Sequence, residues 1–223
     1  MGSSEEELFA SARRELFSAV IGDVMDKMGL QHQFLPPAIM ALERSMTVCG
    51  RALTVLEADL SNDVTGVSER PFGLMMDALD DIKTNEVYIC TGASPSYALW
   101  GEMMSVRAMK CGAAGAVVDG YSRDTRGIIN LGFPTFSHGS YAQDQGPRGK
   151  VVDFRIPIQV GQVRVSPGDI VFGDVDGVCV VPRVAEQEAL ARAFEKARKE
   201  KVVRKALEEG VSARDAFEKY GIL

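Results

Sequence analysis

The chain has 223 residues, of which 46% are hydrophobic and 25% charged, a composition typical of globular proteins. A mixed α/β chain of this length can fold as one domain with its own core, so we predict a single domain over residues 1–223. The net charge of −6 and the pI of about 5.1 argue against a nucleic-acid or anionic-membrane partner. The start of the chain has no signal-peptide pattern, and no apolar run reaches the ~20 residues of a membrane span, which predicts a cytoplasmic protein.

The N-terminal part of the chain is predicted to hold two helices and a strand. Apolar residues recur at spacings of three and four over residues 5–28, which predicts a helix that Gly29 ends. Residues 47–56 are predicted to form a strand, with Gly50 as a candidate bulge. A short helix is predicted for residues 71–79.

The middle of the chain alternates between short apolar runs and helical segments. The predicted strands cover residues 87–91, 116–118 and 134–136, and the predicted helices cover 101–110 and 123–131. This alternation is typical of a layered α/β domain.

The last part of the chain changes character twice. Short β-like runs are separated by Gly, Pro and Asp turns, over residues 151–160, 162–165, 169–173 and 178–181. A long polar-rich helix then covers 185–209 and a shorter one, capped by Ser212, covers 213–220. Residues 185–223 therefore form a helical arm, which we expect to pack on a neighbouring subunit.

The predicted helix 101–110 begins with Gly101 and Glu102. Backbone N–H groups in the first turn of a helix have no partner within the helix, and the helix dipole adds a positive potential there. The amides of Glu102, Met103 and Met104 are therefore candidate donors to a substrate carboxylate.

Arg123 and Asp124 lie just beyond the carboxyl end of the predicted strand 116–118, where ligands gather in open α/β folds. An arginine can grip a carboxylate or a 2-oxo group in fixed geometry, and an aspartate can hold a divalent cation. A cation bound to a 2-oxo acid stabilises an enolate. The alternative is that this Arg-Asp dipeptide is an ordinary surface ion pair.

The spacing of these residues resembles that of a known family. Glu102 is followed by twenty residues, 103–122, and then by Arg123-Asp124 and, after two more, Gly127. The pattern is similar to that of the RraA-like family, which includes the regulator of ribonuclease activity A and the 4-hydroxy-4-methyl-2-oxoglutarate/4-carboxy-4-hydroxy-2-oxoadipate aldolases. The chain departs from it in having Asn130 where the aldolases have an acidic residue, and Glu102 where they usually have Asp.

The resemblance extends over nearly the whole chain. Segments similar to the family's opening helix, first core strand, central strand and late hairpins are residues 18–26, 50–52, 133–136, 146–149 and 167–178. The fold that the resemblance implies is a layered α/β/β/α domain of the swivelling type with helices at both ends. It also implies a homotrimer or a hexamer, with the active site at a subunit interface.

The resemblance further implies roles for the site residues. Arg123 would bind the pyruvyl carboxylate and the enolate oxygen, and Asp124 would be the direct ligand of Mg²⁺, Mn²⁺ or another divalent cation. Backbone donors from Gly101 to Met104 would hold the substrate carboxylate. Glu102 would act through metal-bound water as an outer ligand or proton relay.

A glutamate of the next subunit is also expected near the metal. Glu200 is the first candidate and Glu195 the second; the alternative for both is an ordinary solvated helix face.

The implied function is cleavage of a 4-hydroxy-2-oxo acid to pyruvate, with oxaloacetate decarboxylation through the same enolate. The alternative, from another class of protein, is a non-catalytic regulator that binds and inhibits an endoribonuclease. Methyl transfer to a quinone is rejected, because no glycine-rich nucleotide loop follows a first strand. The native oxo acid, the metal and the choice between trimer and hexamer are left open.

Other residues could carry chemistry but have ordinary structural explanations. His138 follows the third central strand and is a candidate for substrate contact, although the family motif has no histidine there. Asp174 and Asp176 are interpreted as turn residues, and Trp100 either lines the pocket or packs beside it. The cysteines fall in no metal or redox motif and are interpreted as buried apolar residues in a reducing compartment; they are Cys49, Cys90, Cys111 and Cys179.

Overall fold

The structure is a computed structural model that describes residues 2–60 and 71–222. Its helices are α1 (Gly2–Glu15), α2 (Ser18–Lys27), α3 (Met75–Asp80), α4 (Glu102–Cys111), α5 (Thr125–Leu131), α6 (Glu186–Glu208) and α7 (Ala213–Tyr220). Its strands are β1 (Met40–Ala41), β2 (Val48–Asp59), β3 (Glu86–Thr91), β4 (Ala98–Trp100), β5 (Gly115–Val118), β6 (Tyr121–Ser122), β7 (Thr135–Ser137), β8 (Gly149–Phe154), β9 (Ile158–Val160), β10 (Val163–Val165), β11 (Ile170–Asp174) and β12 (Gly177–Val181).

The main sheet has eight strands in the order β1-β7-β5-β3-β2-β11-β12, with β8 also paired to β2. The central strands β2, β3, β5 and β7 run parallel, and the outer pairs are antiparallel. Strands β9 and β10 form a separate hairpin, and β4 and β6 a short parallel pair. Because β4 and β6 lead directly into α4 and Arg123, this short pair fixes the candidate site.

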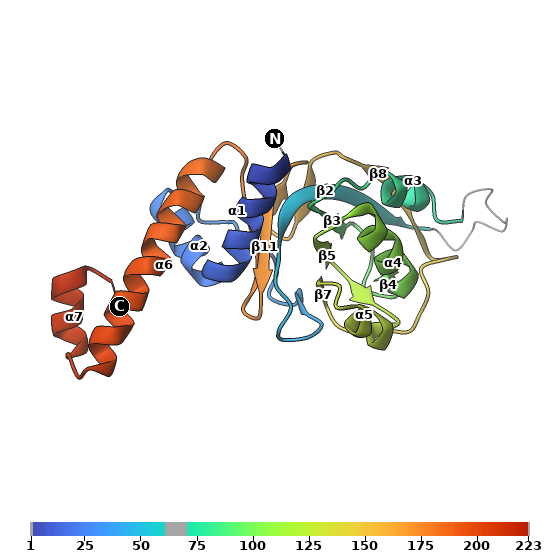
Figure 1. The fold of residues 1–223 in the computed structure, drawn as a ribbon. Helices are drawn as coiled ribbons and strands as arrows, with labels where there is room; N and C mark the ends of the chain where they lie inside the picture. The colour runs from blue at the N-terminus through green and yellow to red at the C-terminus, as the bar shows by residue number, and fades with distance from the viewer. Residues whose placement is uncertain (1, 61–70, 223) are drawn as a thin grey trace.

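Both faces of the parallel strands are covered, which explains why β3 is buried along its whole length. Alternate residues of β2 point to opposite faces. Leu53 lies in the cluster that α3, α4 and α5 cover, and Ala52 lies in the cluster that the β9–β10 hairpin covers. Helices α1, α2 and α6 pack beside β11 (Figure 1). The layered α/β/β/α class with helices at both ends, predicted from the sequence, is confirmed.

The prediction of one helix over residues 5–28 is wrong in one respect, because this segment forms two helices, α1 and α2. Phe17 is extended, with φ −143° and ψ 156°, and separates α1 from α2. The backbone N–H and the hydroxyl of Ser18 both donate to the carboxylate of Asp174, at 2.7 Å each. This buried contact fixes a new helix start and gives Asp174 the structural role predicted for it.

Three further boundaries differ from the sequence prediction. Residues 72–74 pair with Val151 in β8, so α3 begins at Met75 and not near residue 71. The predicted strand 151–160 is divided into β8 and β9, with Arg155 between them at φ 56°. Gly50 pairs in register with Val171, and the register shift lies instead in the pairing of β2 with β8, where Leu56 and Glu57 face Asp153 and Val151 and skip Val152.

The C-terminal arm has the predicted form. The first half of α6 packs on α1 and α2 through Ala189, Leu190 and Ala193, and its second half extends from the body with α7 folded back on it (Figure 1). Ser212 Oγ accepts the N–H of Asp215 at 3.1 Å, as the cap prediction requires. In the described parts of the chain, no helix is long and apolar enough to cross a membrane.

Candidate active site

The candidate site is built around the N-terminus of α4. Gly101, the N-cap of α4, is extended and buried. A Cβ atom at this position would lie 2.9 Å from Asp124 Oδ2 and 3.5 Å from Arg123 Cγ. The N–H of Arg123 donates to the carbonyl of Trp100 at 2.8 Å. Glycine at position 101 therefore lets the Arg123-Asp124 turn lie directly against the start of α4.

Asp124 has an unusual backbone conformation. Its φ of 57° and ψ of 30° are left-handed, which is uncommon for a residue with a side chain and is concentrated at functional sites. An aspartate at a helix N-cap ordinarily caps its own helix, but Asp124 does not cap α5. Its Oδ2 lies instead 3.4 Å from the backbone N of Glu102. The backbone thus directs this carboxylate toward α4, and the side chain is 47% exposed.

Arg123 lies between two carboxylates. Its Nη1 is 3.3 Å from Asp144 Oδ1 and its Nε is 3.8 Å from Asp124 Oδ2. The Arg123 side chain is half-buried, at 40% exposed, and faces a cavity. Its guanidinium is therefore oriented by protein contacts but remains accessible to a small anion.

Glu102 lies in the first turn of α4 and leans over helix α5. A Cβ atom at Gly127 would overlap the carboxyl group of Glu102. The spacing pattern of the sequence is therefore explained in space, because Glu102, Arg123, Asp124 and Gly127 meet at one point. Met103 projects outward at 69% exposure.

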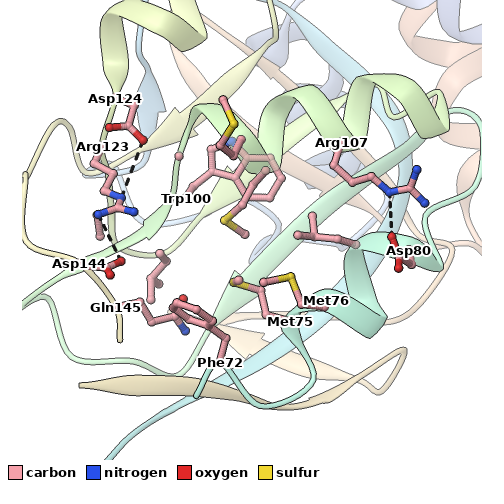
Figure 2. A pocket seen from close by; sticks show the side chains of 16 residues that line it. Phe72, Met75, Met76, Asp80, Trp100, Arg107, Arg123, Asp124, Asp144 and Gln145 are labelled. Atoms are coloured by element: carbon pink, nitrogen blue, oxygen red, sulfur yellow. Dashed lines mark hydrogen bonds and ion pairs between the residues drawn. The ribbon is translucent and has the colours of Figure 1, made fainter. Parts of the chain in front are cut away.

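The site opens into a cavity of about 380 Å³ (Figure 2). Arg123, Asp124 and Asp144 lie at one end, and the ion pair of Arg107 Nε with Asp80 Oδ1, at 2.8 Å, lies at the other. Aromatic, methionine and leucine side chains line the space between: Phe72, Met75, Met76, Leu79, Leu99, Trp100, Met103 and Met104. The cavity thus has a charged end, with Arg123, joined to a largely apolar chamber.

Beneath the cavity lies a buried polar cluster. Gln145, which lines the cavity, donates from Nε2 to Glu57 Oε2 at 2.6 Å. Burial raises the pKa of Glu57 to about 8, against the lowering effect of the Gln145 hydrogen bond. Glu57 Oε1 and the hydroxyl of Tyr88 are buried and have no hydrogen-bond partner among the described residues.

Sequence reasoning did not find several of these residues. Asp144 and Gln145 lie in a polar loop without a motif, and only folding brings them to Arg123 and Glu57. Glu57 did have a signal in the sequence, because it follows Leu53 and Val55 on the same buried face of a strand, where an apolar residue is expected.

Other candidates lie away from the cavity. His138 Nε2 is 3.2 Å from Asp119 Oδ1, and His138 is not among the residues that line the cavity. The interpretation of the cysteines as buried residues holds for Cys49, Cys90 and Cys179, while Cys111 is half-buried; all four are unpaired. Burial raises the pKa of Cys49 to about 12, so its thiol is unsuited to nucleophilic catalysis.

Taken together, the fold and the site define a mixed α/β protein in which the start of helix α4 lies beside an Arg-Asp turn. The sequence model of the family described as "RraA-like: Aldolase/RraA" matches residues 18–180. The chain belongs to the RraA-like family.

Individual relatives agree with this assignment. A protein of Halalkalibacterium halodurans, whose name proposes a 4-hydroxy-4-methyl-2-oxoglutarate aldolase, is 30% identical over 216 residues, 96% of each chain. Protein DlpA of Legionella pneumophila is 26% identical over 203 residues, and this chain spans only about a third of its length (32%). The crystal structure of Streptomyces coelicolor RraAS2, described as an unusual member of the RNase ES inhibitor RraA protein family, has a TM-score of 0.76 at 26% identity, covering 89% of this chain and 96% of that one.

Proposed function

We propose that this protein is a divalent-metal-dependent lyase that cleaves a 4-hydroxy-2-oxo acid to pyruvate and a second carbonyl compound. The observation that carries the proposal is the convergence of Arg123, Asp124 and the start of α4 at one end of the cavity. Relatives named for aldolase activity support a lyase in general.

A metal site at Asp124 is consistent with the residues present. The described parts of the chain contain no group of three or more His, Cys, Asp or Glu side chains that could hold a metal ion. Magnesium does not need such a group, because it is usually held by one or two carboxylates with water and substrate oxygens. Asp124 offers a half-exposed carboxylate that does not cap its own helix α5, and whose contact with α4 is the long 3.4 Å hydrogen bond from the N–H of Glu102. When bound, Mg²⁺ or Mn²⁺ would withdraw electrons from the 2-oxo group.

Groups of the protein itself would bind the substrate, stabilise the developing charge and accept the proton. The amides of Met103 and Met104 in the first turn of α4 would hold the substrate carboxylate. Arg123 would stabilise the 2-oxo oxygen as negative charge moves onto it. Glu102 would accept the proton of the 4-hydroxyl group, directly or through water.

The proton and electron changes then balance. The 4-hydroxyl loses its proton, C4 becomes a carbonyl, and the electron pair of the C3–C4 bond forms the pyruvate enolate. That enolate takes up a proton at C3 to give pyruvate. Oxaloacetate decarboxylation would pass through the same enolate with loss of CO₂, so one site could perform both reactions.

A second candidate function is a non-catalytic regulator that binds an endoribonuclease. The similarity to RraAS2 and the net charge of −6, suited to a basic partner segment, favour this alternative. Docking alone does not require the set of Glu102, Arg123, Asp124 and Gly127, so we place the enzyme first.

The assembly that we propose is a trimer or a hexamer. The arm carries exposed apolar residues beyond the body of the protein: Val202, Leu207, Val211 and Phe217. Glu200 and Glu195, the proposed neighbour ligands, pair within α6 with Lys196 at 3.3 Å and Lys199 at 2.6 Å. The Lys199–Glu195 pair is exposed and would break at little cost. In the Lys196–Glu200 pair the lysine is only 14% exposed, and Asp23 would remain as its partner if Glu200 were released.

The test is a pyruvate-release assay on a panel of 4-hydroxy-2-oxo acids and oxaloacetate, with magnesium and with EDTA. Metal-dependent release from at least one member is expected. If no member reacts, while the protein inhibits an endoribonuclease, the regulator takes the lead.

A further inference from the structure

The cavity is larger and more apolar than the pyruvyl part of a substrate requires. We infer that the 4-hydroxy-2-oxo acid carries an apolar substituent at C4, an alkyl or aryl group, which occupies the chamber between Arg123 and Arg107. This inference rests on the proposed function, and it names the substrate class for the same site.

The walls of the chamber form a surface suited to hydrocarbon. Trp100 is 1% exposed and is fixed between two rings, with centroids 4.9 Å from Tyr88 and 6.1 Å from Phe133. Opposite it, Met75 and Met76 project from α3 (Figure 2). A rigid aromatic wall facing flexible thioether side chains can enclose alkyl or aryl groups of different shapes.

The charges in the cavity do not favour a second carboxylate. Arg107, the cation at the far end, is already paired with Asp80 at 2.8 Å. Arg123, at the near end, is needed to bind the 2-oxo group, and it lies beside Asp124 and Asp144. A distal carboxylate would therefore have to compete with Asp80 for Arg107, and at the near end it would meet the like charges of Asp124 and Asp144.

The volume fits the same interpretation. At about 380 Å³ the cavity lies within the usual range for small-molecule sites, about 300–1,000 Å³. Each methylene group of the substituent that leaves water for the chamber should strengthen binding by up to about fourfold. The second product would accordingly be an apolar aldehyde or ketone.

The binding test uses Trp100, which is the single tryptophan of the chain and lines the cavity. Its fluorescence is titrated, with magnesium present, using 2-oxooctanoate and 2-oxooctanedioate. These acids have the same length and differ only in a terminal methyl or carboxylate group. Neither has a 4-hydroxyl group, so neither is cleaved. We expect the dissociation constant of 2-oxooctanoate to be at least about tenfold lower.

A pair of variants locates the chamber. Met76 lines the cavity but is 53% exposed, so Met76→Lys should fold and should place a cation where the substituent ends. Met76→Lys should weaken the binding of 2-oxooctanoate and strengthen the binding of 2-oxooctanedioate, so that the preference between the two acids is reversed. Met109→Lys is the matched control, because Met109 is exposed on α4 and does not line the cavity. It should leave the preference unchanged.

The contrary outcomes are distinct. Equal or tighter binding of 2-oxooctanedioate to the unaltered protein would overturn the inference, as would a preference that Met76→Lys does not alter. Light scattering measures the oligomer mass of Met76→Lys. If that mass falls while the variant still prefers 2-oxooctanoate, Met76 lies in a contact between copies of the chain and not in a substrate chamber. Pyruvate release from 4-hydroxy-2-oxo acids is measured separately. Its absence, together with the expected binding preference, would reject the proposed reaction and leave the apolar chamber established.

Discussion

Helix α5 places Gly127 directly beneath the carboxyl group of Glu102, so that a Cβ atom at position 127 would overlap that group. The glycine of the sequence pattern thus makes room for the acidic residue twenty-five positions before it. This contact, more than any conformational need of α5, explains why a glycine occurs within that helix.

Gly127→Ala should separate activity from stability. The added methyl group displaces the flexible Glu102 side chain from Cγ outward and meets no backbone atom among its nearest neighbours, and alanine favours a helix over glycine by about 1 kcal/mol. We expect an unchanged or higher melting temperature and a fall in kcat for pyruvate release of roughly tenfold or more. This is less than the roughly 10²–10⁴-fold loss on removing a general base, because Glu102 is displaced and not removed. Asn130→Ala, at an exposed position of the same helix, is the control. Equal kcat values for Gly127→Ala and the control would remove Glu102 from the reaction.

Arg123→Ala should lower kcat by on the order of 10²–10³, the usual loss when one oxyanion donor is removed. Arg123→Lys should restore only part of this, because an ammonium group cannot reproduce the planar guanidinium between Asp124 and Asp144. Steady-state kinetics with circular dichroism of each variant checks the prediction. A full rescue by lysine would show that the charge alone is required.

Asp124→Asn should abolish metal binding and retain the fold. Asparagine tolerates the left-handed backbone that Asp124 adopts, so the change removes the charge without adding strain. Titration of Mn²⁺ followed by electron paramagnetic resonance should show one bound ion in the unaltered protein and none in the variant, with similar melting temperatures. Undiminished Mn²⁺ binding by the variant would contradict the assignment.

Stability should depend on Glu57 above pH 5. The pKa of this buried acid is about 8 in the folded protein, above its ordinary value of 4.5, so the folded state holds the proton more tightly. The resulting stabilisation is complete below pH 4.5 and is lost as the pH rises through 8. Since one pKa unit corresponds to about 1.4 kcal/mol, the loss is on the order of a few kcal/mol.

Glu57→Gln keeps the shape of the neutral acid and removes its titration. Between pH 6 and 9 its free energy of unfolding should vary less with pH than that of the unaltered protein, and it should be the more stable form at pH 9. Urea unfolding at a series of pH values measures both curves. Parallel curves would mean that Glu57 does not titrate in this range.

The exposed apolar residues of the C-terminal arm lead us to predict that the chain forms oligomers. Light scattering at micromolar concentration should give about 73 kDa, three times the chain mass of 24.2 kDa, or twice that for a hexamer. A mass near 24.2 kDa would refute the proposed interface. Replacing Phe217, which is 57% exposed on α7, with Asp should weaken the assembly if the arm forms the contact.

The sequence by itself determined the α/β class and most helix and strand positions, and its resemblance to the RraA-like family indicated the association of Glu102 with Arg123 and Asp124. These features depend on local periodicity, on glycine and proline signals, and on a spacing that spans one helix and one strand. Where no distant contact competes with such short-range patterns, they set the element positions, and α4 and β5 lie close to their predicted positions.

Only the tertiary structure decided the break before Ser18, the start of α3 and the composition of the cavity. Ser18 binds Asp174, 156 positions away, and Glu57 binds Gln145, 88 positions away. Neither contact leaves a periodic trace in the sequence. The energy of burying and pairing such polar groups overrides local propensity, and it is realised only when distant segments meet.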